Sequence, residues 1–420
     1  MLIKLRTANL KKQNIEEIIC EKFKSEDILR WGGISYDELN KEILVEAYPT
    51  PYPIEAKDLS RIKKKYSEKT IGAMIIPTGI ACSVGGFGGD ANLVTNLVSS
   101  EFDYLIVNPN VTNGGAWQNI SENTLYVEGA AIDLFMKSRI GLRPVRQNKL
   151  GVIFDKNLPK DTLWKELQTV KAAEEIWGID FLGYETTEES ISPEIKVLEG
   201  GCSSGFINNP ESLIKSARKI IQRGAEAIAI VTYWNEELNN LDTDYLQGSG
   251  PDPIGGIEAL LSHTITKKFL IPCAHAPSFP LNIDEENLGK EIDSRVSPEI
   301  TSYSFLPSVL KGLSRAPQLV EKEDVLLGDL TLHNLTSFIG PKDCWMGSSF
   351  FNALKKTKEI DCYAVQSNTS KAGIEPEILS GEFTEDLKQN LKQNVFKPQN
   401  YLELIGFLKM NKSGMKINRY

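Results

Sequence analysis

A cluster of glycines follows the first strongly apolar segment of the chain, and these residues could bind an anion. The segment Pro77–Ala91 reads PTGIACSVGGFGGDA and leads into an amphipathic helical pattern. Glycines let a ligand approach the backbone closely, and the amides at a helix N-terminus favour negative charge. We therefore predict a cradle for a carboxylate or phosphate, with a loop packed for geometric reasons as the alternative. The residues expected to bind the anion are Gly79, Gly85, Gly86, Gly88, Gly89 and Asp90.

Two later turns have a similar composition and extend the predicted anion site. In GGCSSG, Ser203 and Ser204 offer hydroxyl groups and backbone amides. In GSGPDPIGG, Gly255 and Gly256 stand immediately before an apolar helical pattern. Ligands of open α/β sheets bind at the carboxyl ends of the strands, where we expect such turns to lie. A long surface loop is the alternative interpretation of the turn that contains Ser203 and Ser204.

Three side chains near these turns have the chemistry of catalytic groups. Cys82 lies inside the first glycine turn, where a helix N-terminus can lower the pKa of a thiol and make it a nucleophile. His275 stands near the end of the apolar run IPCAHAP and could act as a general acid or base, as could Asp252. The alternatives are a small buried cysteine and a histidine that is hydrogen-bonded at a strand end.

Further polar residues could bind an anion or a metal. Arg143 and Arg146 could pair with an anionic ligand, because a guanidinium suits carboxylate and phosphate groups; surface ion pairs are the alternative. Glu258 and His263 are five residues apart on a predicted helix, which is about 140° around its axis, so they do not form a two-ligand metal motif. We therefore predict no metal site, and no pattern identifies a cofactor.

Alternating strand and helix patterns predict the fold that positions these groups. Short apolar runs occur at 70–77, 104–109, 149–155, 227–234 and 269–277, and helical patterns separate most of them. The run AIAIVTYW has almost no polar residue, which is typical of a strand buried on both faces of a parallel sheet. We predict an α/β fold with mostly parallel sheets and helices on both faces, Rossmann-like, in two α/β lobes.

Composition shifts predict the boundaries of these parts. Residues 1–66 are charged and contain a proline-rich run, and we assign them to an N-terminal appendage. Residues 67–148 form the first lobe with the glycine-rich loop, and 149–320 the second. Residues 321–420 form a C-terminal extension. Whether the chain forms a homo-oligomer stays open.

The overall composition argues against several classes of protein. Acidic residues outnumber basic ones by 56 to 47 and the net charge is −9, whereas nucleic-acid binders usually carry a basic excess. No window approaches the roughly 18 consecutive apolar residues of a membrane span, and the N-terminus lacks a secretory-signal pattern. The six cysteines are scattered, without a C-x-x-C pair. We expect a cytoplasmic protein with reduced thiols that binds a small anionic molecule, and neither nucleic acid nor membrane.

Several long motifs together resemble a known family. IPTGIACSVGGFGGDAN, LRPVRQNKLGVIFD, QGSGPDPIGGIEALLSH, PCAHAP and SFLPSVLKGLSRAPQ occur in this order between about residues 70 and 318. They resemble an uncharacterised family of cyanobacteria and algal plastids that carries a domain-of-unknown-function label. The resemblance implies no activity. In that family a histidine often stands where this chain has Asn108, and the second turn often reads Ser-Thr-Gly, so Cys202 is not expected to be a shared catalytic thiol.

These observations favour a small-molecule metabolic enzyme of isomerase, lyase or hydrolase type whose substrate carries a carboxylate or phosphate. Cys82, Asp252 and His275 would supply the acid, base or nucleophile, and the glycine turns would stabilise negative charge. The alternative is a non-catalytic ligand sensor or assembly protein of a photosynthetic organism, which the family distribution motivates. Convergence of the three side chains around a concave pocket would favour the enzyme.

Overall fold

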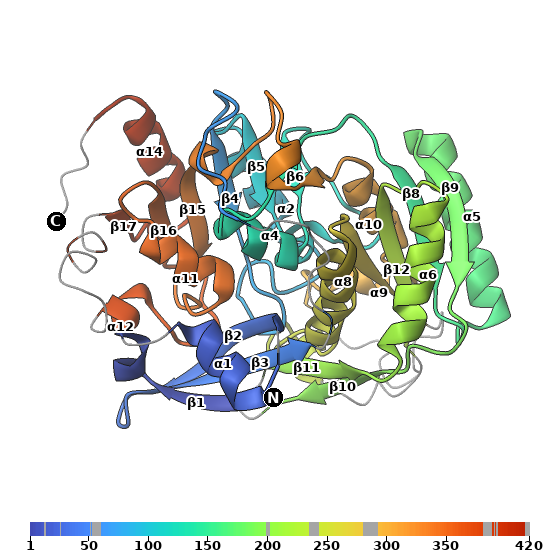
Figure 1. Ribbon diagram of the computed structural model, residues 1–420, viewed down its shortest axis with the longest axis horizontal. Helices are drawn as coiled ribbons and strands as arrows, with labels where there is room; N and C mark the ends of the chain where they lie inside the picture. The colour runs from blue at the N-terminus through green and yellow to red at the C-terminus, as the bar shows by residue number, and fades with distance from the viewer. Residues whose placement is uncertain are drawn as a thin grey trace.

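Two parallel β-sheets organise the protein (Figure 1). The computed structural model describes residues 1–11, 14–25, 27–50, 52, 60–198, 202–234, 243–279, 293–380, 389, 391 and 394–415. Helices pack against both sheets, and a small antiparallel sheet from the N-terminal part of the chain lies below them in the view of Figure 1. This arrangement confirms the predicted α/β class.

The first sheet has six parallel strands in the order β17-β16-β15-β4-β5-β6. They are β4 (Ile71–Met74), β5 (Tyr104–Val107), β6 (Thr124–Tyr126), β15 (Leu335–Pro341), β16 (Asp361–Val365) and β17 (Val395–Phe396). Three of these strands come from the predicted C-terminal extension, so a boundary at residue 320 separates strands that share one sheet. The strand order reverses between β4 and β15, which is where ligands of open α/β sheets bind.

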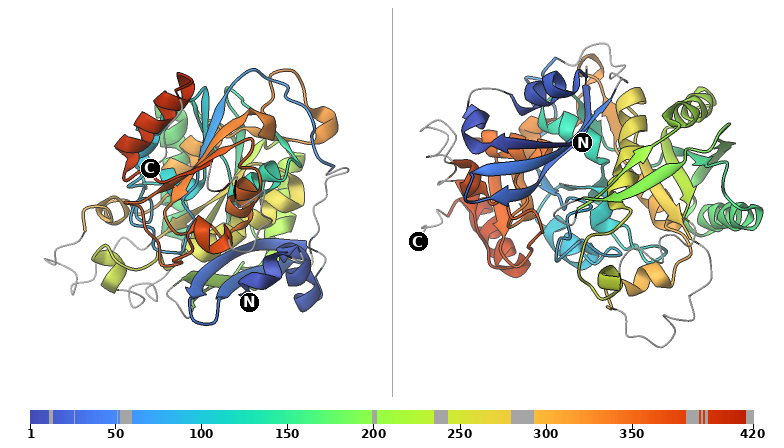
Figure 2. Two further views of the ribbon diagram at one scale, coloured as in Figure 1. Left: turned by 90° about the vertical axis from the view of Figure 1, so that its left-hand side faces the viewer. Right: turned by 90° about the horizontal axis from the view of Figure 1, so that it is seen from below.

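Four helices cover the first sheet. Two of them pack against each other on one side, and the other two form a pair on the other side (Figure 2). The first pair is α2 (Asn92–Ser99) and α14 (Tyr401–Lys412), and the second is α4 (Gly129–Met136) and α11 (Ser348–Lys355). The glycine-rich turn joins β4 to α2, as its sequence position predicts.

The second sheet has four parallel strands in the order β13-β12-β8-β9. They are β8 (Lys149–Phe154), β9 (Asp180–Thr186), β12 (Ala227–Tyr233) and β13 (Cys273–Ser278). The helices around this sheet are α5 (Lys160–Trp177), α6 (Pro210–Gln222), α8 (Gly255–Phe269) and α10 (Leu306–Ser314).

Strand β12 shows why this sheet needs helices on both faces. Ala227, Ala229 and Val231 belong to the core shared with α5 and α10. Ile228 and Ile230 point the other way, into the core shared with α6 and α8. Because successive side chains of a strand alternate between faces, an apolar residue at every position requires cover on both sides. The sequence prediction of a doubly buried strand is confirmed.

The N-terminal part of the chain forms a three-stranded antiparallel sheet in the order β1-β3-β2. Its strands are β1 (Leu2–Arg6), β2 (Asp27–Asp37) and β3 (Glu42–Thr50). Strand β2 packs against both α8 and α11, and the Gly33 amide donates to the Met346 carbonyl oxygen over 2.5 Å. A Cβ at Gly33 would lie 2.5 Å from Ile374, so this approach needs a glycine. The predicted appendage is therefore packed onto both lobes.

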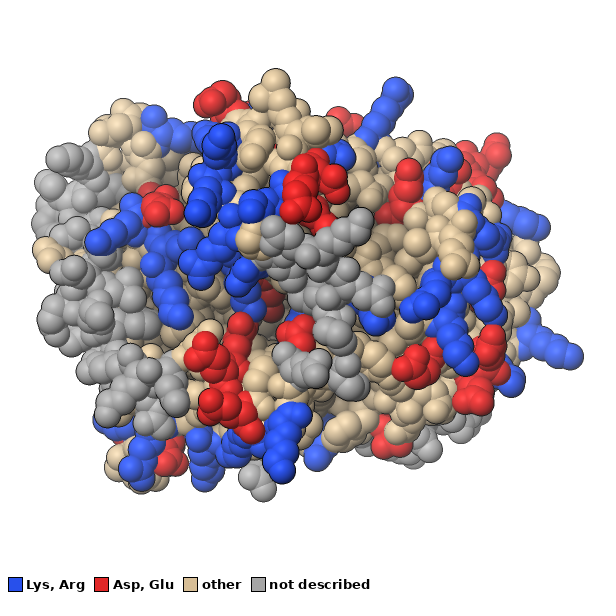
Figure 3. Space-filling view, in the orientation of Figure 1, with Lys and Arg blue, Asp and Glu red and all other residues tan. Residues whose placement is uncertain are grey.

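Short elements complete the described part of the chain. They are the β7 (Gly141–Arg143) and β14 (Gln318–Val320) pair, the hairpin of β10 (Pro193–Val197) and β11 (Ser203–Ile207), and the helices α1 (Ile15–Phe23), α3 (Pro109–Thr112), α7 (Thr243–Leu246), α9 (Ser297–Ile300) and α12 (Pro376–Ser380). Among the described helices, none has the length and apolar character to cross a membrane. Figure 3 shows lysines and arginines gathered over α11 and the first sheet, and mixed charges over the second sheet.

Candidate functional site

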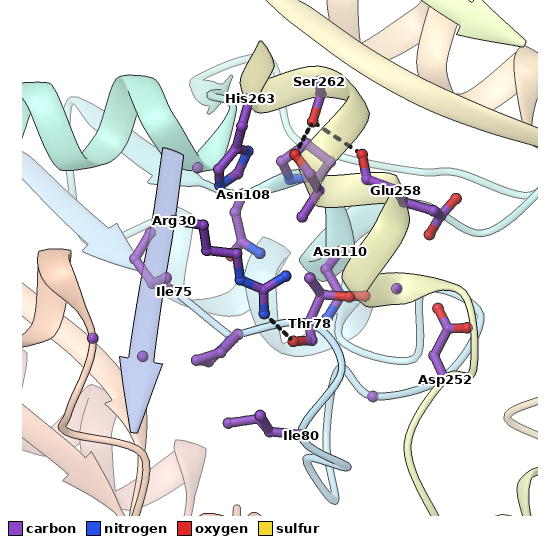
Figure 4. A pocket seen from close by; sticks show the side chains of 18 of the residues that line it. Arg30, Ile75, Thr78, Ile80, Asn108, Asn110, Asp252, Glu258, Ser262 and His263 are labelled. Atoms are coloured by element: carbon purple, nitrogen blue, oxygen red, sulfur yellow. Dashed lines mark hydrogen bonds between the residues drawn. The ribbon is translucent and has the colours of Figure 1, made fainter. Parts of the chain in front are cut away.

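A cavity of about 200 Å³ lies where the two parallel sheets and the N-terminal sheet meet. The segments that follow β4, β5 and β6 at the carboxyl edge of the first sheet form one side. Helix α8 and strand β13 form another, and β2 and the start of α11 close it. Figure 4 shows side chains from these separate elements pointing into one hollow.

Arg30 on β2 supplies positive charge to this cavity (Figure 4). Its guanidinium donates hydrogen bonds to the carbonyl oxygens of Thr78 (3.1 Å) and Gly256 (3.3 Å). Arg30 forms no ion pair with any residue in the part of the chain that the structure describes. Carbonyl oxygens orient a guanidinium without neutralising it, so its charge is available to an anionic ligand.

The N-terminus of α11 faces the same cavity, which its residues Gly347, Ser348 and Ser349 line. The hydroxyl of Ser348 is buried and has no hydrogen-bond partner among the described residues. Helix N-terminal amides carry partial positive charge and bind anions. This end of the cavity therefore offers unused donors next to β2, the strand that carries Arg30.

The amides of the first glycine turn already have carboxylate partners within the protein. Asp90 accepts hydrogen bonds from the amides of Gly85 (2.8 Å) and Phe87 (3.2 Å). Glu299, on α9, accepts from the amide of Gly88 (2.6 Å) and from a tyrosine hydroxyl. The acceptors for these three amides are thus carboxyl groups of the chain itself. Gly86 and Gly89 line the cavity beside them.

The three glycine-containing turns do come together, but they pack against one another. The Ser203 amide donates to the Gly79 carbonyl oxygen (2.9 Å), and the Ser203 hydroxyl accepts from the Gly256 amide (3.0 Å). A Cβ at Gly79 or Gly256 would lie 2.6 Å or 2.3 Å from atoms of Ser203. A Cβ at Gly255 would clash in the same way, at 2.3 Å from the Thr78 hydroxyl oxygen. Close backbone packing accounts for glycine at these positions, as the alternative interpretation of the first turn proposes.

Three carboxyl groups at the cavity wall favour their protonated form. Asp252 lies before α8, Glu258 lies in its first turn, and Glu299 is contributed by α9. Burial raises the pKa of Glu258 to about 8. Burial and mutual repulsion also raise the pKa of Asp252 and of Glu299. At neutral pH these groups can therefore donate protons or hydrogen bonds inside the cavity.

His275 is hydrogen-bonded on both sides of its ring. Its Nδ1 lies 3.0 Å from the Glu258 carboxyl group and its Nε2 lies 2.6 Å from the Thr232 hydroxyl. Burial lowers the pKa of the imidazole to about 3, so it is neutral at pH 7. The structure thus brings two of the predicted catalytic groups, His275 and Asp252, to one cavity, which Glu258 also lines.

The structure places Cys82 in the apolar core rather than among the residues that line the cavity. Its thiol donates to the Pro77 carbonyl oxygen over 3.8 Å. Desolvation raises the thiol pKa, whereas a nucleophilic thiolate needs a lowered one. This geometry fits the alternative of a small buried side chain.

Several other predicted binding residues lie elsewhere. Arg143 forms a two-pronged ion pair with Asp329, with both N···O distances at 2.8 Å. Arg146 is exposed and, like Arg143, does not line the cavity. Ser204 is buried in the β10–β11 hairpin, outside the cavity lining. Within the described residues, no group of His, Cys, Asp and Glu is arranged to hold a metal ion.

Sequence reasoning missed a second pair formed by a glutamate and a histidine. Glu128 caps α4 and lies in contact with Nδ1 of His263 on α8; both residues line the cavity. It also missed Arg30 and Glu299. The adjacent glycines 32–33 in a strand are a signal of close backbone approach near Arg30. No local pattern marks Glu299, because its role depends on distant partners.

The amide group of Asn108 serves the fold. Its Oδ1 accepts from the Ile76 amide (3.0 Å) and its Nδ2 donates to the Ile76 carbonyl oxygen (2.8 Å). A carboxamide matches this donor–acceptor pair and ties the end of β5 to the segment after β4.

Comparison with known proteins agrees with the family resemblance. The family described as "Protein of unknown function (DUF3326)" matches residues 71–420. An uncharacterized lipoprotein of Synechococcus sp. is 31% identical over 344 residues, which cover 81% of this chain and 90% of that protein. No solved structure matches the chain. Because the family match includes every strand of both parallel sheets, the chain belongs to this family of proteins of unknown function.

Proposed function

We propose that the protein is an enzyme that carries out acid–base chemistry on a small carboxylate- or phosphate-bearing molecule in this cavity. One observation carries the proposal: the guanidinium of Arg30, which has no ion-pair partner among the described residues, shares a cavity with carboxyl groups of raised pKa. Perturbed carboxyl groups that converge in a cavity are typical of catalytic sites.

Two features of the cavity support an anionic ligand. Arg30 and the N-terminus of α11 attract negative charge, and the raised pKa values of Glu258 and Asp252 weaken the repulsion from these two carboxyl groups. A cavity of 150 Å³ can hold benzene, so about 200 Å³ suits a small metabolite. Glu258 can give a proton to a substrate oxygen, and hydrogen bonding to His275 fixes its orientation.

Ligand-induced thermal stabilisation tests the binding part of this proposal. The probes are a panel of small mono- and dicarboxylates and phosphate esters, with wild type, Arg30→Met and Arg146→Met measured side by side. Binding to the native state adds about 2.7 kcal/mol to the free energy of unfolding at 100 times the Kd, and the melting temperature rises accordingly. We expect stabilisation by at least one probe in wild type and in Arg146→Met, and its loss in Arg30→Met.

Equal stabilisation of all three proteins by every active probe would remove Arg30 from the site and overturn the proposal. Turnover of a bound probe separates the enzyme from the alternative, a non-catalytic ligand sensor. That alternative predicts binding that depends on Arg30 with the probe recovered unchanged.

A further inference from the structure

Glu128 and His263 lie in contact between α4 and α8, with a carboxyl oxygen of Glu128 against Nδ1 of the imidazole. Glu128 accepts hydrogen bonds from the amides of Ala130 (2.8 Å) and Ala131 (3.3 Å) at the start of α4. The hydroxyl of Ser262 donates to it over 3.3 Å. The two amides hold this carboxyl group in place, and the same oxygen that Ser262 contacts lies against Nδ1 of His263.

The other ring nitrogen of His263 is unoccupied. Nε2 has no hydrogen-bond partner among the residues that the structure describes, and the side chain is 9% exposed at the cavity lining. The ring lies over Gly129, where a Cβ would be 2.7 Å from Cε1, so glycine is needed for this ring position. A carboxylate beside Nδ1 retains the proton on that nitrogen, which leaves a lone pair on Nε2.

The two histidine pairs lie along one wall of the cavity. Glu258 and His263 both belong to α8, and their Cα atoms are about 7.5 Å apart along the helix axis. The Ser262 hydroxyl lies 3.3 Å from the Glu128 carboxyl oxygen and 3.3 Å from the backbone carbonyl oxygen of Glu258, and can donate to either. Figure 4 shows His263 and Glu258 beside the same hollow that Arg30 enters. Both residues thus line the cavity that Arg30 enters.

We propose that His263 is a general base that removes a proton from carbon next to the carbonyl group of a small oxo acid. This inference rests on the proposed function and names its substrate class. Arg30 would hold the carboxylate of the substrate. The C–H proton moves to Nε2 of His263, the C–H electron pair forms a carbon–carbon double bond, and the carbonyl π pair moves to oxygen. Glu258 gives its proton to that oxygen, so the product is an enol.

The step is redox-neutral and needs no co-reactant. After it, His263 carries one more proton and Glu258 one fewer. Returning a proton to carbon from His263, with transfer of the enol proton back to Glu258, restores both groups. The net reaction is an isomerisation by proton transfer, or exchange of the C–H proton with solvent when carbon is reprotonated at the same position.

Exchange of substrate protons with deuterated solvent tests this inference. Pyruvate, 2-oxobutyrate and acetoacetate are incubated in D2O with the full chain, and proton NMR follows the signals next to the carbonyl group. We expect wild type to accelerate exchange of at least one probe. General acid–base groups contribute about 10²–10⁴-fold, so His263→Asn and Glu258→Gln should each lose at least about 100-fold. His333→Asn changes an exposed histidine outside the cavity and should exchange as wild type does.

The outcomes separate the two proposals. Exchange by His263→Asn at the wild-type rate would overturn the role of His263. Binding of a probe that depends on Arg30 but without accelerated exchange would overturn proton abstraction and leave the proposed binding site intact. Failure of every probe and every panel compound to bind would refute both.

A second variant guards against misfolding of His263→Asn. Glu128→Gln keeps the shape of the side chain and its amide contacts at α4 but removes the negative charge beside Nδ1. We expect it to melt close to wild type, to bind the active probe, and to lose at least tenfold in exchange rate. In nitrogen NMR of the imidazole rings, wild-type His263 should carry its proton on Nδ1. A proton found only on Nε2 would contradict the proposed base.

Discussion

At the scale of single residues, the site consists of side chains whose chemistry is set by burial. Glu258 and Glu299 are ordinary glutamates in the sequence, and the fold raises the pKa of each by removing water. No spacing rule could predict this, because the neighbours of Glu299 are Gly88 and Tyr245 from distant segments. The predictions for His275 and Asp252 located the cavity because each follows a recognisable strand or glycine turn.

Replacement of Glu299 tests the protonated state of this cluster. In Glu299→Gln the amide oxygen can still accept from Gly88 and Tyr245, and the side chain cannot ionise. The variant should lie close to wild type near pH 5 and be more stable at pH 9, by up to about 4–5 kcal/mol, because the pKa is raised from 4.5 to about 8 and each pKa unit corresponds to about 1.36 kcal/mol. Chemical denaturation at both pH values measures the difference. Glu122→Gln, at an exposed position, should show no such change.

Cys82 should behave as a core residue. Cys82→Ala removes one buried sulfur, so we expect a loss of about 1 kcal/mol in unfolding free energy. Stabilisation by the active ligand should be retained in the thermal assay. A folded Cys82→Ala protein that no longer responds to the ligand would instead restore Cys82 to the binding site.

At the scale of elements, most strands that precede residue 280 in both sheets could be predicted from the sequence. A short apolar run between two helical patterns is typical of a buried strand. The glycine turns were also located correctly as strand-to-helix connections. Their packing was not predictable, since the contacts of Gly79 with Ser203 and Gly256 join segments more than 120 residues apart. The N-terminal sheet was missed as a wall of the cavity for the same reason.

Gly86 shows what the first turn requires. A Cβ at this position would lie 2.2 Å from the Cys82 carbonyl oxygen, so Gly86→Ala should destabilise the protein by about 1–3 kcal/mol. Gly406→Ala is the matched control on α14, where no atom lies within 4 Å of the added Cβ. A helix gains about 0.5–1 kcal/mol from this change, so the control should be stabilised. Equal effects of the two substitutions in urea unfolding would contradict close packing at Gly86.

At the scale of the whole molecule, buried titratable groups make stability depend on pH. Burial raises the pKa of Glu166 to about 7 and of Glu258 to about 8. Their stabilising contribution is complete below the unfolded pKa and is lost as pH rises through these folded values. His275 acts in the opposite direction, since its lowered pKa destabilises the fold only as pH falls below about 6.5.

Between pH 6.5 and 8 the carboxyl groups therefore dominate, and stability should fall as pH rises. Each such proton contributes a slope of about 1.4 kcal/mol per pH unit. Unfolding free energies measured across this window should show the decline. In Glu258→Gln the slope should be smaller by up to about 1.4 kcal/mol per pH unit, because one titrating carboxyl group is removed. A flat or rising profile in wild type would show that these carboxyl groups ionise normally.

The order of strands in the first sheet has a consequence for synthesis of the protein. β4 is a central strand, but one of its two neighbours, β15, lies more than 260 residues further along the chain. While the ribosome translates the intervening segments, one edge of β4 has no partner, and an unpaired strand edge favours aggregation. The first sheet can therefore form only after β15 has been translated, and until then the nascent chain presents this edge to other chains.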